Sequence, residues 1–289
     1  MSPFELVEPT SLGEAVALLD RDDPEVRVIG GGTALMLMMK AGFFSPKRLV
    51  SLRALAAPLA EIAASPEGGL RIGAMVRLSE LERAPEVQRL APVIPQTLLT
   101  HSNVRVRNVA TVGGNLAHGD PHMDMPPVLI ALAATVEAVG PHGDRTIAVE
   151  DLFAGYFETV LAGDEVISAV AIPPQPARRT VYAKVTTRAA DDWPALGIAL
   201  SAAVQGDKLI DPRVVVSAAT EKPMRLPQTE ALLGERAADG GLLREAGRCA
   251  AAEAPIVADA QGSASYKRVL LGVHLWRAVQ RLLTGETAS

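Results

Sequence analysis

A run of three glycines between an apolar strand and a helix constrains the fold of this chain more than any other feature. Gly30, Gly31 and Gly32 follow the strand-like residues 26–29 and precede residues 34–40, which are compatible with a helix. A second strand is expected at residues 49–52. A strand, a helix and a strand within so short a stretch predict a parallel unit, because parallel strands need such a crossover.

A second glycine segment lies about eighty residues further along the chain. Gly113 and Gly114 lack a Cβ atom, so their backbone can approach a bulky anion closely. Thr111 and Asn115 flank them with short polar side chains, and the stretch ends at Asp124 before a helix expected to start at residues 126–127. Taken alone, Gly-Gly-Asn is also typical of a turn between strands. Two such segments together favour a clamp for a phosphate-bearing ligand.

Neither segment is a common nucleotide-binding fingerprint. The first lacks the third glycine of G-x-G-x-x-G, and Lys40 is not preceded by the glycine that a P-loop requires. The anion therefore has to be held in another way.

Cysteine content and charge exclude several other classes of protein. Cys249 is the only cysteine, so the chain has no internal disulfide, no thiolate zinc site and no iron–sulfur cluster of its own. A net charge of -5 gives no basic excess to neutralise nucleic-acid phosphates. Without a signal peptide or a long apolar window, we predict a cytoplasmic protein with no integral membrane segment.

The prolines at residues 173–176 divide the chain, since proline cannot extend a sheet ladder. We predict a domain at residues 1–174, with a small parallel lobe over about 1–55 and a larger mixed lobe over about 56–174, and a second domain at 175–289. Strands are expected at 135–139, 146–149, 166–172, 181–186, 196–204 and 213–219, and helices at 242–253 and 266–283. In the last helix, the apolar stripe Val269, Val273, Trp276, Val279 and Leu283 is expected to pack in its own lobe.

The paired motifs Gly30-Gly31-Gly32-Thr33 and Thr111-Val112-Gly113-Gly114-Asn115, with Asp124 nine residues after the asparagine, carry a family resemblance. The chain resembles the FAD-binding medium subunit of molybdenum hydroxylases, a family that includes aerobic carbon monoxide dehydrogenase and the flavin domain of xanthine dehydrogenase. Further matching segments follow in the family's order over nearly all 289 residues. The resemblance implies an α+β fold: a two-lobed FAD-binding domain of the molybdenum-hydroxylase flavoprotein type, followed by a C-terminal α/β lobe.

The resemblance also implies which residues bind FAD. Both glycine segments would surround the pyrophosphate with backbone N–H groups, Asp124 would accept hydrogen bonds from cofactor hydroxyls, and Lys184 would contact the flavin. The full predicted set is Val28, Ile29, Gly30, Gly31, Gly32, Thr33, Ala34, Leu35, His101, Thr111, Gly113, Gly114, Asn115, Asp124, Val166, Ile167, Lys184 and Trp193.

Three of these residues also have plain structural interpretations. Asp124 could be a helix N-cap, Trp193 could pack in the core, and His101 could be an ordinary histidine at a helix end.

The function that the resemblance implies is electron transfer. This chain would carry noncovalent FAD, accept electrons from two [2Fe–2S] clusters on a small partner subunit, and work beside a large molybdopterin subunit in a dimer of heterotrimers. The electron acceptor could be NAD, a quinone, oxygen or another carrier. We predict an oxidoreductase in which this chain supplies no catalytic side chain.

Two alternatives come from the residues themselves. His118, Asp120, His122 and Asp124 alternate and could form the metal site of a hydrolase. The chain could also be a non-catalytic interaction subunit whose glycine segments bind nothing.

Overall fold

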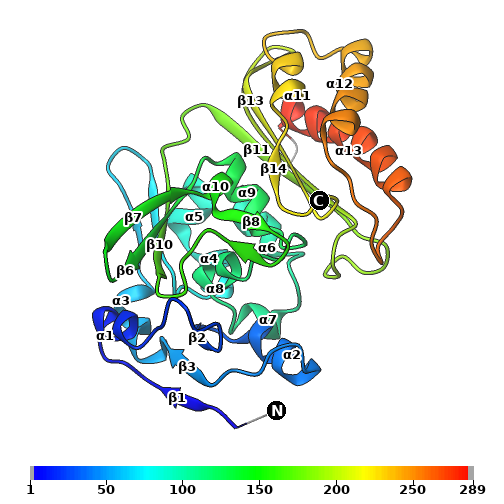
Figure 1. Cartoon of the computed structure of the whole chain (residues 1–289). Coiled ribbons are helices and arrows are strands. Elements are labelled where there is room, and N and C mark those ends of the chain that lie inside the picture. The colour runs from blue at the N-terminus through cyan, green and yellow to red at the C-terminus, as the bar shows by residue number, and fades with distance from the viewer. Residues whose placement is uncertain (1–2, 286–289) are drawn as a thin grey trace.

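The structure is a computed structural model that describes residues 3–285. Its strands form a three-stranded, a five-stranded and a four-stranded sheet, together with a two-stranded ribbon of β8 (Phe153–Gly155) and β9 (Glu158–Thr159). The N-terminal sheet lies at one end of the molecule and the four-stranded sheet at the other, with the five-stranded sheet and its helices between them (Figure 1).

The small N-terminal sheet confirms the parallel unit predicted around the glycine triplet. Its order is β1 (Glu5–Val7), β3 (Arg48–Ser51) and β2 (Val26–Ile29), and both pairings are parallel. Helix α2 (Thr33–Ala41) makes the crossover from β2 to β3, while α1 (Leu12–Ala17) joins β1 to β2. The glycine triplet therefore lies where β2 ends and α2 begins.

The central sheet is antiparallel wherever its strands pair. Its order is β4 (Ile62–Ala64), β5 (Leu70–Gly73), β10 (Val166–Ile172), β6 (Thr135–Gly140) and β7 (Gly143–Ala148). The intervening helical elements are η1 (Arg53–Leu55), α3 (Ala56–Leu59), α4 (Leu78–Arg83), α5 (Pro85–Leu90), α6 (Val93–Leu98), α7 (Val104–Arg107), α8 (Val112–Ala117), α9 (Met125–Ala131) and α10 (Val149–Leu152). The main hydrophobic core forms between the sheet and helices α4, α5, α6, α8, α9 and α10.

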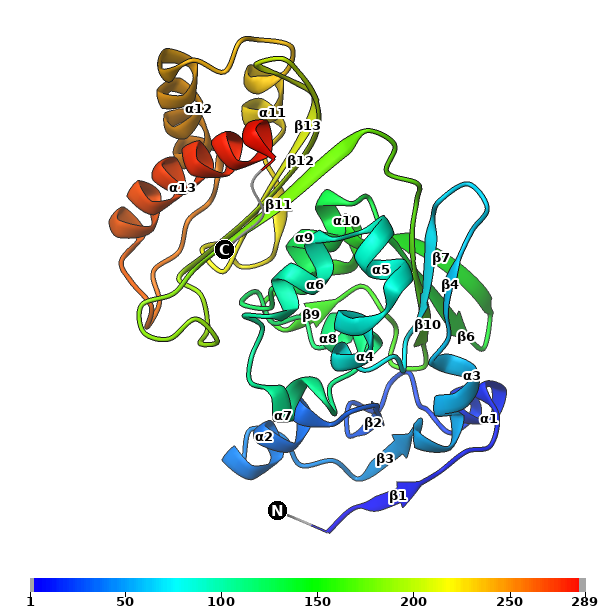
Figure 2. The same cartoon turned by 180° about the vertical axis from the view of Figure 1, so that it is seen from behind.

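The C-terminal sheet has helices on both faces. Its order is β11 (Arg178–Val185), β12 (Leu196–Gln205), β13 (Lys208–Ser217) and β14 (Met224–Arg225). Helices α11 (Pro227–Leu233), α12 (Gly240–Glu253) and α13 (Ala264–Thr284) cover one face, and α6 and α9 approach the other (Figure 2). Because side chains alternate along a strand, Tyr182 of β11 joins the main core while its neighbour Val181 joins the C-terminal core. The face of β11 that carries Tyr182 and Lys184 is therefore turned toward the central helices.

The buried face of α13 coincides with only part of the predicted stripe. Val269 and Val273 are 65% and 43% exposed, whereas Leu271, Leu275 and Leu282 are buried. Val279 is buried and Trp276 and Leu283 pack against the C-terminal core, so the prediction holds for these three residues and is wrong for Val269 and Val273. Neither α13 nor any other helix within residues 3–285 is long and apolar enough to span a bilayer. The domain division at residues 174 and 175 stays a prediction.

Candidate functional site

The two glycine segments, far apart in sequence, lie against each other. A Cβ atom on Gly31 would collide with the backbone carbonyl of Val109, and one on Gly30 would lie 2.9 Å from Thr111 Oγ1. Glycine therefore suits both positions, because the Val109 backbone lies against Gly31 and the Thr111 side chain lies against Gly30.

The start of α2 has backbone N–H groups that find no acceptor within residues 3–285. Gly32 precedes the helix in the left-handed region (φ 69°), and no side chain caps the helix. The first backbone bond of this helix runs from Met36 to the Gly32 carbonyl, so the N–H groups of Thr33, Ala34 and Leu35 have no helical acceptor. Free N–H groups at the positive end of a helix suit a phosphate.

The second glycine segment is a helix, not the loop that the sequence suggested. Thr111 is the N-cap of α8, and its Oγ1 accepts from the Gly114 N–H at 3.2 Å. The N–H groups of Val112 and Gly113 donate to the carbonyls of Val76 and Ala74, at 3.0 and 2.8 Å. The prediction that free N–H groups of this segment surround a pyrophosphate is therefore wrong, because the threonine cap and the neighbouring strand end already use them.

What this segment offers instead is the side chain of Asn115. Its Nδ2 donates to Met123 Sδ at 3.3 Å, while its Oδ1 is buried and has no hydrogen-bond partner among the described residues. A buried acceptor without a partner costs about 1–3 kcal/mol, so such groups are rare without a reason. This oxygen and the N–H groups at the start of α2 belong to segments that contact each other, and together they fit a ligand that carries both an anion and hydrogen-bond donors, as FAD does.

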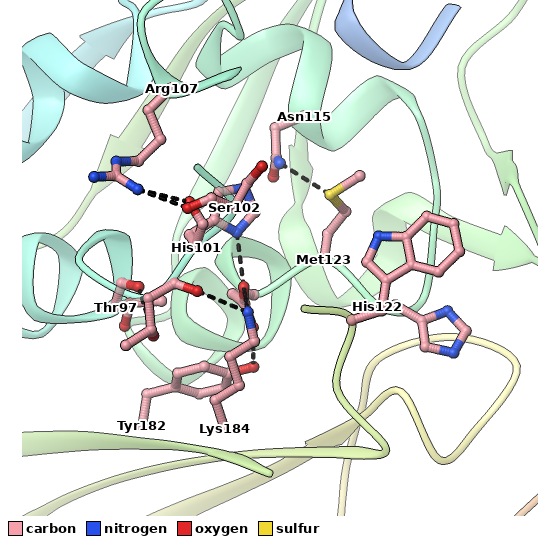
Figure 3. Close-up of polar contacts among 12 residues, drawn as sticks. Thr97, His101, Ser102, Arg107, Asn115, His122, Met123, Tyr182 and Lys184 are labelled. Atoms are coloured by element: carbon pink, nitrogen blue, oxygen red, sulfur yellow. Dashed lines mark hydrogen bonds and ion pairs between the residues drawn. The ribbon is translucent and has the colours of Figure 1, made fainter. Parts of the chain in front are cut away.

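A buried polar cluster surrounds Asp124, which is 2% exposed. Its Oδ1 accepts from the Tyr182 hydroxyl at 2.7 Å, and its Oδ2 lies 3.0 Å from Lys184 Nζ and 2.8 Å from His101 Nδ1. Figure 3 shows His101 approaching from one side and Tyr182 and Lys184, both on β11, from the other. Asp124 occupies the N-cap position of α9, as the structural interpretation expected, but its side chain makes no capping bond to the helix.

The charges in this cluster compensate each other. Lys184 neutralises Asp124 and also donates to the Thr100 carbonyl at 2.8 Å. Since a carboxylate only accepts, His101 must carry its proton on Nδ1. Burial, and then the charge of Asp124, raise the pKa of Tyr182 well above its usual value, so the phenol stays protonated and donates.

A tight turn positions His101 for this contact. His101 follows α6 and is buried, and Ser102 after it has a positive φ of 55°. The Arg107 guanidinium donates to the carbonyls of His101 and Ser102 at 3.2 and 2.7 Å. His101 is therefore not a plain surface histidine at a helix end.

Sequence reasoning missed Tyr182. The available signal was its position two residues before Lys184, because residues i and i+2 of a strand face the same side.

Three predicted residues lie outside these contacts. Val166 and Ile167 begin β10 with buried side chains, 3% and 5% exposed, so only their backbone could face a ligand. Trp193 lies in the connection between β11 and β12 and is 57% exposed, so its interpretation as a core residue is wrong. Its indole stacks on His122.

The four alternating residues of the hydrolase alternative diverge. His118 packs against Phe157, and His122 lies between Asp120 and Asp259, while Asp124 points into its own cluster. Within residues 3–285, no group of three or more histidine, cysteine or acidic side chains is arranged to hold a metal ion. The metal-dependent hydrolase has no support in this geometry.

The fold and the two glycine segments define the class of protein: an FAD-binding flavoprotein with a mixed α+β N-terminal part and a sheet-and-helix C-terminal part. Residues 2–175 match the family model of the FAD binding domain in molybdopterin dehydrogenase, and residues 181–282 match that of the CO dehydrogenase flavoprotein C-terminal domain. The chain belongs to this family, and is an FAD-binding oxidoreductase subunit of the molybdenum hydroxylase type.

Similar proteins extend the match over nearly the whole chain. The carbon monoxide dehydrogenase medium chain of Afipia carboxidovorans is 29% identical over 280 residues, 96% of either chain. The glyceraldehyde dehydrogenase medium chain of Sulfolobus acidocaldarius is 27% identical, over 96% of this chain and 98% of that one. A solved carbon monoxide dehydrogenase structure from Hydrogenophaga pseudoflava superposes with a TM-score of 0.93 at 29% identity, covering 98% of both chains. The predicted family and fold class are confirmed.

Proposed function

We propose that this chain binds one noncovalent FAD and transfers electrons within a larger complex, from the [2Fe–2S] clusters of a small partner subunit to a terminal acceptor. When bound, FAD supplies a centre that can exchange both single electrons and electron pairs. The observation that carries the proposal is the meeting of the α2 N-terminus with the segment that holds the unpartnered Asn115 Oδ1.

Different residues of this chain would bind different parts of the cofactor. The N–H groups at residues 31–35 would hold the pyrophosphate, with Val28, Ile29 and Gly30 shaping its approach. Thr111, Gly113, Gly114 and Asn115 would line the opposite side of the dinucleotide.

The remaining predicted residues would meet the flavin end of the cofactor. The cluster of His101, Asp124 and Lys184 would present polar groups to it, and the backbone of Val166 and Ile167 and the ring of Trp193 would border it. These side chains bind and orient, and we assign none of them a proton-transfer or nucleophilic role.

The proposed partners follow from what this chain lacks and from what its relatives are called. A single cysteine cannot hold an iron–sulfur cluster, which usually needs four cysteine ligands. The similar proteins from Afipia and Sulfolobus are medium chains of larger dehydrogenases. We infer a large molybdopterin subunit and a small [2Fe–2S] subunit, in a cytoplasmic dimer of heterotrimers that passes electrons to NAD, a quinone, oxygen or another carrier.

The first experiment measures the cofactor directly. The purified chain is denatured, and the released flavin is identified and counted against protein. We expect one FAD per chain, either as purified or after reconstitution. A folded chain that is colourless and refuses added FAD would refute the proposal and favour the non-catalytic interaction subunit.

The second experiment tests the partners. The chain is co-expressed with candidate large and small subunits, and substrate is added without oxygen. We expect the flavin absorbance of the complex to bleach while that of the isolated chain stays oxidised. Bleaching of the isolated chain would make it a self-contained flavoenzyme instead.

A further inference from the structure

His122 lies between two carboxylates that come from distant parts of the chain. Its Nδ1 is 3.0 Å from Asp120 Oδ1, and its Nε2 is 3.1 Å from Asp259 Oδ2. Carboxylates accept hydrogen bonds and donate none, so both ring nitrogens have to donate. Only the imidazolium form of histidine can do this, and the geometry therefore fixes His122 as a cation.

The charges around His122 balance only in this form. Asp259 Oδ2 also accepts from Lys267 Nζ at 2.6 Å, and Lys267 is fully buried and donates to the Ala218 carbonyl as well. Two carboxylates thus face two cations. Loss of the His122 proton would leave one excess negative charge in a largely buried network and would turn a ring lone pair toward a carboxylate oxygen.

The exposed connection between β11 and β12 packs against this network through Trp193. The Trp193 indole stacks on the His122 ring, with centroids 5.9 Å apart and planes 23° from parallel. A cation within about 6 Å of a tryptophan ring is attracted by the ring's quadrupole, and that attraction disappears when the cation is neutralised. The Thr187 hydroxyl, in the same connection between β11 and β12, donates to Gln261 Oε1 at 3.1 Å.

We propose that His122 is a proton-operated latch, whose imidazolium fastens the connection carrying Trp193 onto the segment from Asp120 to Asp124, and whose deprotonation releases it. The segment beneath is continuous with the candidate site. Met123 follows His122 directly, and its sulfur accepts from Asn115, as Figure 3 shows. Release of the latch would therefore change how far the region around Asn115 is covered. The latch rests on contacts within this chain and does not depend on FAD.

The direction of the pH effect follows from the groups that face His122. Burial lowers the pKa of His122, but the hydrogen bonds and charges of Asp120 and Asp259 outweigh burial and raise it above the usual value of 6.5. Tyr156 packs edge-on against the imidazole, and burial and the two carboxylates raise its pKa, so it stays neutral.

Two further titratable groups, Lys267 and His118, interact with the carboxylates beside His122. Lys267 reaches the histidine only through Asp259, and the two groups together hold the pKa of that carboxyl below its usual value despite its burial. Burial lowers the pKa of His118, so its titration falls below that of His122. A histidine whose folded pKa is raised contributes most at low pH and loses its contribution as pH rises through that pKa. The latch is fastened below that value and released above it.

The test uses the fluorescence of Trp193 in the full-length chain. Trp276 is the only other tryptophan, so Trp276→Phe leaves Trp193 as the single reporter. A protonated imidazole stacked on an indole quenches its emission. We expect emission to rise with a midpoint above pH 6.5, and acrylamide quenching to increase across the same midpoint.

Three variants assign the midpoint to the latch. His122→Gln in the Trp276→Phe background should abolish it, and the matched control His118→Gln on the same loop should leave it in place. Asp259→Asn should lower it by about one pH unit, because an opposite charge at this distance shifts a pKa by about 1–3 units. A midpoint that survives His122→Gln, or none above pH 6.5, would overturn the proposal.

A measurement on the unchanged chain covers the case in which a variant fails to fold. The ¹⁵N shifts of the imidazole nitrogens, followed as a function of pH, should show a histidine that keeps both nitrogens protonated up to the fluorescence midpoint and loses one proton there. If no histidine titrates at the fluorescence midpoint, the latch is contradicted. Recording both titrations with and without added FAD separates this outcome from any failure of FAD binding.

Discussion

Gly31→Ala is the substitution that tests most directly why the two glycine segments must touch. The added Cβ would collide with the Val109 carbonyl oxygen and lie 2.8 Å from the Val109 carbonyl carbon and 2.9 Å from Ala110 Cα. All three are backbone atoms, so no flexible side chain can move aside. Gly31 does not have a positive φ, so the effect is steric and not conformational.

The expected magnitude follows from the cost of overpacking, typically about 1–3 kcal/mol. If the segments separate to relieve the collision, the loss appears in FAD affinity, as a Kd raised about 5- to 150-fold at 1.4 kcal/mol per tenfold change. If they stay together, the same loss appears as a lower free energy of unfolding. The two quantities are measured by quenching of flavin fluorescence on titration and by urea denaturation of the FAD-free chain.

A control separates this contact from a general effect of replacing glycine. Gly13 lies in α1, and a Cβ there meets nothing within 4 Å. Gly13→Ala should leave FAD affinity unchanged and stabilise the chain by about 0.5–1 kcal/mol, since alanine favours a helix. If Gly31→Ala matches the parent in both Kd and unfolding, the argument from close backbone approach is refuted.

Three further substitutions probe the site. Gly114→Val should remove FAD while circular dichroism stays that of the parent, because a Cβ there meets only Thr111 Oγ1, at 3.0 Å; unchanged FAD content would make Gly114 a purely structural residue. Asn115→Leu should raise the free energy of unfolding of the FAD-free chain by about 1–3 kcal/mol in urea denaturation, because it removes an unpaired buried acceptor, and it should lower FAD affinity. A variant in which stability and FAD affinity both rise, or both fall, would count against a ligand at Asn115 Oδ1. Asp124→Asn should lower the free energy of unfolding by about 3–5 kcal/mol, since it leaves the buried Lys184 cation without its carboxylate, and a loss below about 1 kcal/mol would show that the pair contributes little.

Local sequence was enough to predict most strands and the position of the first glycine segment. Residues 166–172 form a strand with those bounds, and the crossover from β2 to β3 is parallel as predicted. Such features depend on apolar runs and on breakers within a few residues, so neighbouring residues decide them. The paired motifs likewise identified the family, since each motif is a continuous stretch of sequence.

Local sequence did not determine which distant residue forms a hydrogen bond or ion pair with a given polar side chain. Asp124 was interpreted as a ligand or a cap, yet its partners Tyr182 and Lys184 lie 58 and 60 residues away on β11 of the C-terminal sheet. His122 was read as a metal ligand, and its second carboxylate, Asp259, lies 137 residues away. Buried polar groups must be paired, but the sequence does not show which distant group is brought near.

The same physical reason explains the two errors about helices. The Thr111 segment became a helix because its threonine caps the first turn and a strand end takes its other N–H groups. Along α13 the predicted stripe through Val269 and Val273 is only partly buried, and the face that enters the core also carries Lys267. Only the tertiary structure supplies Asp259 and the Ala218 carbonyl, which satisfy the lysine and let that face enter the core. Periodicity thus determined that residues 264–284 are helical, while the pairing of one buried charge determined which face of the helix is buried.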